Sequence, residues 1–331
     1  GLRRMKSVRV LRAGTLTTLQ DRGRVGHRHL GVSAGGPMDS AAFRLANLLV
    51  GNASDQAALE LTLVGPALLW LQTVTLAVTG ADMHPEVHFP DGRVRDLSHG
   101  RPVVVPAGTV TEFGEAKRGC RAYLAVAGGF AGPVVLGSRA ALLRSGFPGL
   151  CGRSLVKGDE LELCREQQGL LEAAVEANWF VDLPHLPARD GQVRVLRCLG
   201  GHHSGLLSAT AARVFESADF RLSTDCDRMG YRLLGPTLSV DSQVQIRSEA
   251  VVPGTVQLTP DGQLLLLMAD CAPTGGYPRI AHVITADLPL AGQLCPGDRV
   301  QFRAVSYEQS QQALLEQERM FSLVRLGLTR D

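Results

Sequence analysis

The part of this chain best suited to chemistry follows a short apolar run in its C-terminal third. The run is Leu264–Ala269, long enough for one buried strand and too short for a capped globular helix. It continues as Asp270-Cys-Ala-Pro-Thr-Gly-Gly-Tyr-Pro-Arg279, in which paired glycines permit positive φ and a close approach of backbone to a ligand. We therefore expect this loop to carry polar side chains to a rim or cleft. An ordinary hairpin loop is the alternative.

Several groups of this loop could act on a substrate. Asp270 and Tyr277 are candidates for the catalytic base and acid, and Arg279 is a candidate for stabilising negative charge. Substrate-binding groups are expected from the loop hydroxyl and the backbone amides, at Thr274, Gly275 and Gly276.

Two further segments carry groups that suit a carboxylate or a carbonyl. Gln257 lies in an apolar setting, where its amide needs a specific partner, and Arg228 supplies a planar fork of donors. Arg228 and its acidic neighbours could instead form ion pairs with one another. An N-terminal segment adds three more candidate substrate-binding residues, Gln20, Asp21 and Arg24. We expect residues 17–39, 225–232, 254–257 and 270–279 to converge on one cleft.

Several familiar chemistries are absent or poorly supported. The chain has no phosphate-binding loop of the Gly-x-x-x-x-Gly-Lys-Ser/Thr type. Ser33 matches Gly-x-Ser-x-Gly but lacks the preceding strand and following helix of a nucleophile elbow. Pro85 lies between His84 and His88, which disfavours a zinc-binding helix, and we expect no metal. Lys6 lacks the flanking methionines of a biotin-attachment site, so we expect no biotin on this chain.

Composition narrows the class of protein. The chain has 331 residues and a net charge of +2 without basic clusters, so we expect no nucleic-acid partner. No apolar segment reaches the roughly 18 residues that span a bilayer, and no signal peptide is expected. Seven widely spaced cysteines indicate free or buried thiols in a reducing cytoplasm.

The elements that must position these groups are mostly strands. Short β-like segments punctuated by 37 glycines and 17 prolines predict a mainly β barrel or sandwich with a few helices. Helices are predicted at 39–49, 166–179 and 308–324, and the last of the strands at 244–246, 264–268 and 280–284. The Pro-rich segment 183–191 is interpreted as a linker. We expect one β-rich unit at residues 1–188, and a second, with a C-terminal helix, at 189–331.

Several of these motifs occur in the order typical of one known family. They include Thr17-Thr-Leu-Gln-Asp-Arg-Gly-Arg-Val-Gly26, Gly35-Gly-Pro-Met-Asp39, Ala58-Leu-Glu60, Tyr123-Leu-Ala-Val-Ala-Gly-Gly129, Asp227-Arg-Met-Gly-Tyr-Arg232 and Thr274-Gly-Gly-Tyr-Pro278. The chain resembles the C-subunit family of bacterial ATP-dependent 5-oxoprolinase, also known as allophanate hydrolase subunit 2-like or biotin-dependent carboxyltransferase proteins. It is also similar to part of the carboxyltransferase region of urea carboxylase.

The resemblance implies two cyclophilin-like β-barrel units. It also implies an enzyme component that is inactive alone and works with two companions of the 5-oxoprolinase, a kinase-inhibitor-like B subunit and an A subunit. The implied reaction is ATP-driven opening of the 5-oxoproline lactam to glutamate, with ATP bound by this chain or by a partner. Two alternatives stay open: a regulatory protein that captures a kinase-inhibitor-like companion, and a urea carboxylase-like carboxyltransferase component.

Overall fold

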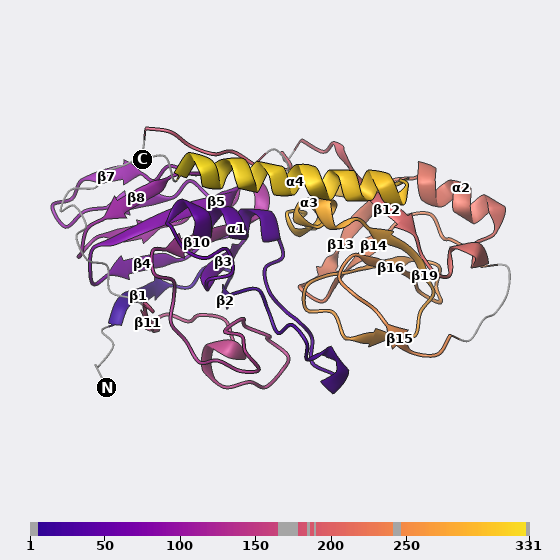
Figure 1. Ribbon diagram of the computed structural model, residues 1–331, viewed down its shortest axis with the longest axis horizontal. Helices are drawn as coiled ribbons and strands as arrows, with labels where there is room; N and C mark the ends of the chain where they lie inside the picture. The colour runs from indigo at the N-terminus through magenta and orange to yellow at the C-terminus, as the bar shows by residue number, and fades with distance from the viewer. Residues whose placement is uncertain (1–5, 165–177, 184–185, 189, 241–245, 329–331) are drawn as a thin grey trace. The chain divides into compact units, whose positions relative to one another are not determined.

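The computed structural model describes residues 6–164, 178–183, 186–188, 190–240 and 246–328 (Figure 1). Contacts between residues divide the chain into two compact units. Unit 1 contains residues 1–25, 35–186 and 327–331, and unit 2 contains residues 26–34 and 187–326. The main division therefore lies between Leu186 and Pro187, and one short N-terminal segment is counted with the second unit.

The strands of unit 1 form two sheets (Figure 1). The first has the order β11-β1-β4-β9-β6-β7, with bounds β11 (Glu160–Glu162), β1 (Lys6–Arg12), β4 (Ala67–Trp70), β9 (Val110–Glu112), β6 (Glu86–His88) and β7 (Val94–Asp96). The second has the order β2-β3-β10-β5-β8, with bounds β2 (Leu16–Gln20), β3 (Ala58–Thr62), β10 (Arg118–Val126), β5 (Val74–Asp82) and β8 (Pro102–Val105). Side chains of both sheets, among them Trp70, Leu76 and Leu124, share one buried apolar cluster.

One helix packs on the second sheet of unit 1. Helix α1 (Ser40–Leu49) contacts β10 and β5, and its buried face includes Phe43 and Leu45. The Asp39 carboxylate accepts a hydrogen bond from the backbone N–H of Ala42 at 2.8 Å, which satisfies one of the free donors of the first turn. The predicted helix at 39–49, with Asp39 as its cap, is confirmed.

Unit 2 is a closed barrel with the order β12-β19-β16-β17-β14-β13-β20. The bounds are β12 (Val193–Gly200), β19 (Arg279–Val283), β16 (Thr255–Leu258), β17 (Leu264–Leu267), β14 (Gly230–Leu234), β13 (Phe220–Cys226) and β20 (Arg299–Ala304). Strands β12 and β20 pair in parallel, and the other neighbours are antiparallel. A separate two-stranded ribbon joins β15 (Glu249–Ala250) to β18 (Thr274–Gly275).

Three helices accompany the barrel: α2 (Ala209–Ser217), α3 (Leu288–Gly292) and α4 (Tyr307–Leu328). Phe215 of α2 stacks on Phe302 of β20, with ring centroids 4.9 Å apart, so this helix contributes directly to the barrel core. Single turns of 3-10 helix occur at Arg28–Leu30, Gly149–Cys151, Ser204–Leu206 and Thr285–Asp287.

The prediction of a mainly β fold with a few helices is confirmed, and so is the helix at 308–324, which is the middle of α4. The expected helix at 166–179 lies, but for its last two residues, outside the described residues, and so do the first two residues of the expected strand at 244–246. Helix α2 was not predicted. Among the described residues, no helix is both long enough and apolar enough to cross a membrane.

Candidate functional site

The β15–β18 ribbon of unit 2 brings together most of the predicted site residues. Glu249 pairs with Gly275 and Ala250 with Thr274, and the N–H of Val251 donates to the carbonyl of Pro273 at 3.0 Å. Thr274, Gly276 and Tyr277 are exposed on this ribbon and the loop that follows it, whereas Gln257 beneath is buried. The loop that follows Leu267 therefore places an exposed rim above a buried amide, as the sequence predicted for a rim or cleft.

Arg228 and Asp270 form a buried ion pair in unit 2. The Nε and Nη2 atoms of Arg228 donate to the two carboxylate oxygens of Asp270 at 3.0 and 2.8 Å. Both side chains are almost fully buried, and the Asp270 N–H also donates to the Arg228 carbonyl at 2.8 Å. The pair therefore fixes the end of the β17 segment against residues 227–229. Substrate binding by Arg228 and proton transfer by Asp270 stay predictions, and each would require this pair to open.

Arg279 is held at the edge of the same ribbon. Its guanidinium forms an ion pair with the partly exposed Glu249 and donates to the Ala250 carbonyl at 3.1 Å. Its backbone N–H donates to Nδ1 of His203 at 3.2 Å. Burial, assisted by the charge of Arg279, lowers the pKa of His203, which favours the neutral ring that this bond requires. Arg279 is thus a cation close to solvent with a pre-set orientation.

Gln257 approaches the loop because Gly275 has no side chain. A Cβ atom added at Gly275 would lie 2.6 Å from the Gln257 amide nitrogen, which is closer than real Cβ contacts. That nitrogen donates to the Tyr277 carbonyl at 3.4 Å, while the Tyr277 side chain is 42% exposed. The glycine therefore serves the close approach that its position in the sequence suggested.

Arg28 joins this site although the sequence did not single it out. It belongs to the short N-terminal segment counted with unit 2, and its Nη2 donates to the carbonyls of Val251 and Pro273. Its charge also acts on the thiol of the buried Cys271. Burial raises the pKa of that thiol and the Arg28 charge opposes the rise, so Cys271 is a poor nucleophile. The sequence signal that could have indicated it is Gly26-His-Arg-His-Leu-Gly31, in which glycines flank the segment that carries Arg28.

The three N-terminal candidates lie in unit 1, where each forms hydrogen bonds with other residues of that unit. Asp21 accepts from the Ser138 hydroxyl at 2.5 Å and from the Arg139 N–H at 2.6 Å. Gln20 and Arg24 donate to the carbonyls of neighbouring residues 141 and 140, at 3.3 and 2.7 Å. All three are buried. Their role in substrate binding, and the convergence of all four segments on one cleft, stay predictions.

Unit 1 also contains a buried polar network that sequence reasoning missed. The Tyr123 hydroxyl donates to Glu60 at 2.7 Å and accepts from the Asp39 N–H at 2.7 Å. The charge of Arg121 lies near the same carboxylate, with 3.9 Å between the closest nitrogen and oxygen. Burial and the charge of Glu60 raise the pKa of Tyr123 well above its ordinary value, so the phenol stays protonated and donates. The network anchors the N-terminal end of α1.

The described residues contain no group of three or more His, Cys, Asp or Glu side chains arranged to hold a metal ion. All seven cysteines are free thiols.

Comparison with known proteins identifies relatives that match nearly the whole chain. Residues 30–304 match the family described as carboxyltransferase domain, subdomain A and B. The chain is 35% identical over 301 residues to the C subunit of 5-oxoprolinase from Haemophilus influenzae, covering 91% of this chain and 92% of the relative. It is 34% identical over 316 residues to the C subunit of 5-oxoprolinase from Escherichia coli, covering 95% and 96%.

A solved structure of urea amidolyase from K. lactis is similar in fold. It matches 97% of this chain with a TM-score of 0.85 and 29% sequence identity. The match covers 20% of the urea amidolyase chain, so the present chain spans about a fifth of that protein.

Proposed function

The chain belongs to the family of the carboxyltransferase domain, subdomains A and B, and from this membership we propose that it is one component of an ATP-dependent 5-oxoprolinase. In this role it helps to open the 5-oxoproline lactam to glutamate, in the cytoplasm. The observation that carries the proposal is the end-to-end correspondence with two bacterial 5-oxoprolinase C subunits, over more than nine-tenths of either chain. A lettered C subunit implies companions, which we propose to be the A and B subunits of the same enzyme.

The chemistry has to overcome the resonance between the lactam carbonyl and its ring nitrogen. We propose that the γ-phosphoryl group of ATP moves to the carbonyl oxygen, releasing ADP. Water then adds to the carbon, and the ring C–N bond breaks as the nitrogen takes a proton. A second water cleaves the resulting acyl phosphate to glutamate and phosphate. Because the sequence has no phosphate-binding loop, ATP is expected to bind with or through a companion protein.

We propose that groups of unit 2 stabilise the negative charge that develops on the carbonyl oxygen of the lactam. Arg279 supplies a cation at the ribbon edge, and the Gly275–Gly276 backbone and the Thr274 hydroxyl supply neutral donors on the exposed rim. We propose that Gln257 holds the amide of the substrate and that the exposed Tyr277 takes part in proton transfer. The Arg228–Asp270 pair holds the segments that carry these groups.

A second candidate function is a carboxyltransferase component of the urea carboxylase type. The specific observation in its favour is the match of 97% of this chain to K. lactis urea amidolyase at a TM-score of 0.85. In that protein the matching region is a fifth of a much longer chain. The sequence identity is higher to the two C subunits, at 35% and 34%, than to this protein, at 29%, which favours the first function.

The test is reconstitution with the companion proteins encoded in the same genome. The full chain is mixed with the A and B subunits and ATP, and glutamate is measured with 5-oxoproline or urea as substrate. We expect glutamate from 5-oxoproline in the complete mixture and none from this chain alone or from a mixture that omits it. ATP-dependent consumption of urea without any glutamate from 5-oxoproline would support the second function and reject the first.

A further inference from the structure

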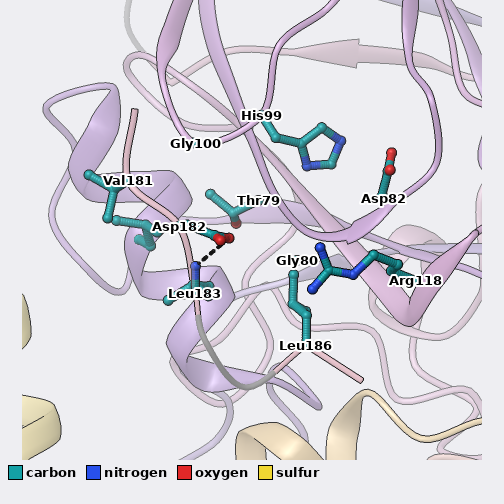
Figure 2. A pocket seen from close by; sticks show the side chains of 11 residues that line it. Thr79, Gly80, Asp82, His99, Gly100, Arg118, Val181, Asp182, Leu183 and Leu186 are labelled. Carbon is teal, nitrogen blue, oxygen red and sulfur yellow. Dashed lines mark hydrogen bonds between the residues drawn. The ribbon is translucent and has the colours of Figure 1, made fainter. Parts of the chain in front are cut away.

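Unit 1 contains a pocket that is lined by none of the candidate site residues discussed above. It has a volume of about 200 Å³ and lies where the paired ends of β5 and β10 meet residues 181–183 and Leu186 (Figure 2). Four apolar side chains line part of it: Leu45, Val181, Leu183 and Leu186. Four ionisable side chains line the rest: Asp82, His99, Arg118 and Asp182. A pocket of this size with a few polar groups on an apolar wall suits a small organic molecule.

The positive group of the pocket is available to a ligand. Within the described residues, the Arg118 guanidinium has no hydrogen bond or ion pair, although Asp82 is its backbone partner on the neighbouring strand. The His99 Nε2 atom is buried and also has no hydrogen-bond partner among those residues. Burial lowers the pKa of His99, so its ring is neutral near pH 7 and Nε2 can donate or accept without adding charge.

The carboxylates of Asp82 and Asp182 each accept a hydrogen bond and have further acceptor positions left. Asp82 accepts from the His84 N–H at 3.0 Å, and Asp182 accepts from the Leu183 N–H at 2.8 Å. A carboxylate has about four acceptor positions, so each can take a further donor. In Figure 2, Asp182 lies on one side of the open space and Arg118 on the other, with His99 above them. Asp82 lies on the same side as Arg118. The pocket therefore offers a carboxylate alone at Asp182, and a guanidinium with a carboxylate beside it on the opposite side.

We propose that this pocket binds a small α-amino acid with an aliphatic side chain. The ligand carboxylate lies against the Arg118 guanidinium and the His99 Nε2 atom, and its ammonium group donates to Asp182. The aliphatic side chain lies on the wall formed by Leu45 and Leu186. The two carboxylates disfavour a simple anion, while the guanidinium disfavours a simple amine. A ligand that carries both charges satisfies both sides. This inference does not depend on the proposed reaction, because none of the residues that line the pocket is a candidate site residue.

The experiment measures binding to the full chain by calorimetry, with L-valine as the probe and two analogues that each lack one charge. Isovalerate has no ammonium group, and isobutylamine has no carboxylate. We expect saturable L-valine binding and at least about tenfold weaker binding of either analogue, because each loses a charge-assisted hydrogen bond. No saturable binding of L-valine would overturn the proposal. Equal affinity for isovalerate would indicate an anion site, and equal affinity for isobutylamine a cation site; either result overturns it.

Two variants assign the binding to this pocket. Arg118→Met should weaken L-valine binding about tenfold or more, because the carboxylate loses its cation. The matched control is Arg9→Met, which removes an exposed arginine from the other sheet of unit 1, where it pairs with Glu160. The control should bind L-valine as the unmodified chain does. If the Arg118 variant binds L-valine as tightly as the unmodified chain and its melting temperature is unchanged, L-valine binds elsewhere and the proposal is overturned.

Discussion

Replacing Asp270 with asparagine should destabilise unit 2 strongly, because the change removes the carboxylate that pairs with the buried Arg228 guanidinium. Arg228 is 4% exposed and Asp270 is 6% exposed, and two hydrogen bonds of 3.0 and 2.8 Å join them. Asparagine keeps the size of the side chain but turns an amide N–H₂ toward a guanidinium that also only donates. Removing one partner of a buried pair costs about 3–5 kcal/mol.

The assay is thermal unfolding of the full chain, followed by calorimetry. For a unit of this size about 3 kcal/mol corresponds to roughly 6–12 °C in melting temperature. The matched control is Asp219→Asn, which breaks the ion pair with Arg299, whose side chains are 31% and 50% exposed. Exposed pairs of this kind contribute about 0–1 kcal/mol, so the control should shift the melting temperature by only a few degrees at most.

The double variant Arg228→Met with Asp270→Asn separates charge burial from loss of contacts. It should recover part of the lost stability, since the buried guanidinium that lost the Asp270 carboxylate is removed as well. The reasoning is refuted if Asp270→Asn costs no more than Asp219→Asn. It is also refuted if the double variant is as unstable as the sum of its single changes.

Three further predictions follow from other contacts. Gly275→Ala should displace the Gln257 amide, because the added Cβ atom would lie 2.6 Å from its nitrogen, and should reduce activity of the complex with little change in melting temperature. Unchanged activity would exclude a role for that amide. Tyr123→Phe should destabilise unit 1 by about 1–3 kcal/mol in urea unfolding, because Glu60 loses a buried donor, and a neutral effect would contradict this. Burial lowers the pKa of His282 from its ordinary 6.5. The free energy of unfolding should therefore fall as the pH drops below 6.5, because the unfolded chain then binds a proton that the folded barrel does not. His282→Gln should flatten this pH profile, and an unchanged profile would show that other groups cause it.

Much of the fold could be predicted because local patterns decide it. The run Leu264–Leu267 forms the buried strand β17, and Asp39 caps α1, since apolar periodicity and capping act over a few residues. Helix α2 was missed because it is short, its buried residues are Ala211 and Phe215, and Phe215 stacks on Phe302 of β20, which lies far away in the sequence. The inclusion of residues 26–34 in unit 2 depends on long-range contacts that no local pattern reports.

For the candidate site, the sequence predicted the course of the loop backbone better than it predicted which side chains pair with each other. Turn chemistry pointed correctly to an exposed Gly-Gly-Tyr-Pro rim after a buried strand. The Arg228–Asp270 pair joins positions 42 residues apart, so sequence alone could assign separate roles to two side chains that bind each other. The contact of Arg28 with Val251 spans 223 residues and was likewise beyond local reasoning.

The most direct test of the proposed function is the activity of the reconstituted complex with Arg279→Ala. The chain variant is combined with the A and B subunits, 5-oxoproline and ATP, and kcat/KM for glutamate formation is measured beside the control Arg299→Ala, which removes an exposed arginine of the same barrel. We expect the Arg279 variant to lose about a hundredfold in kcat/KM, as when one donor to a developing oxyanion is removed, with its melting temperature and its assembly with the partners nearly unchanged. The control should keep full activity. Full activity of the Arg279→Ala complex would contradict the assignment of lactam activation to this site of unit 2.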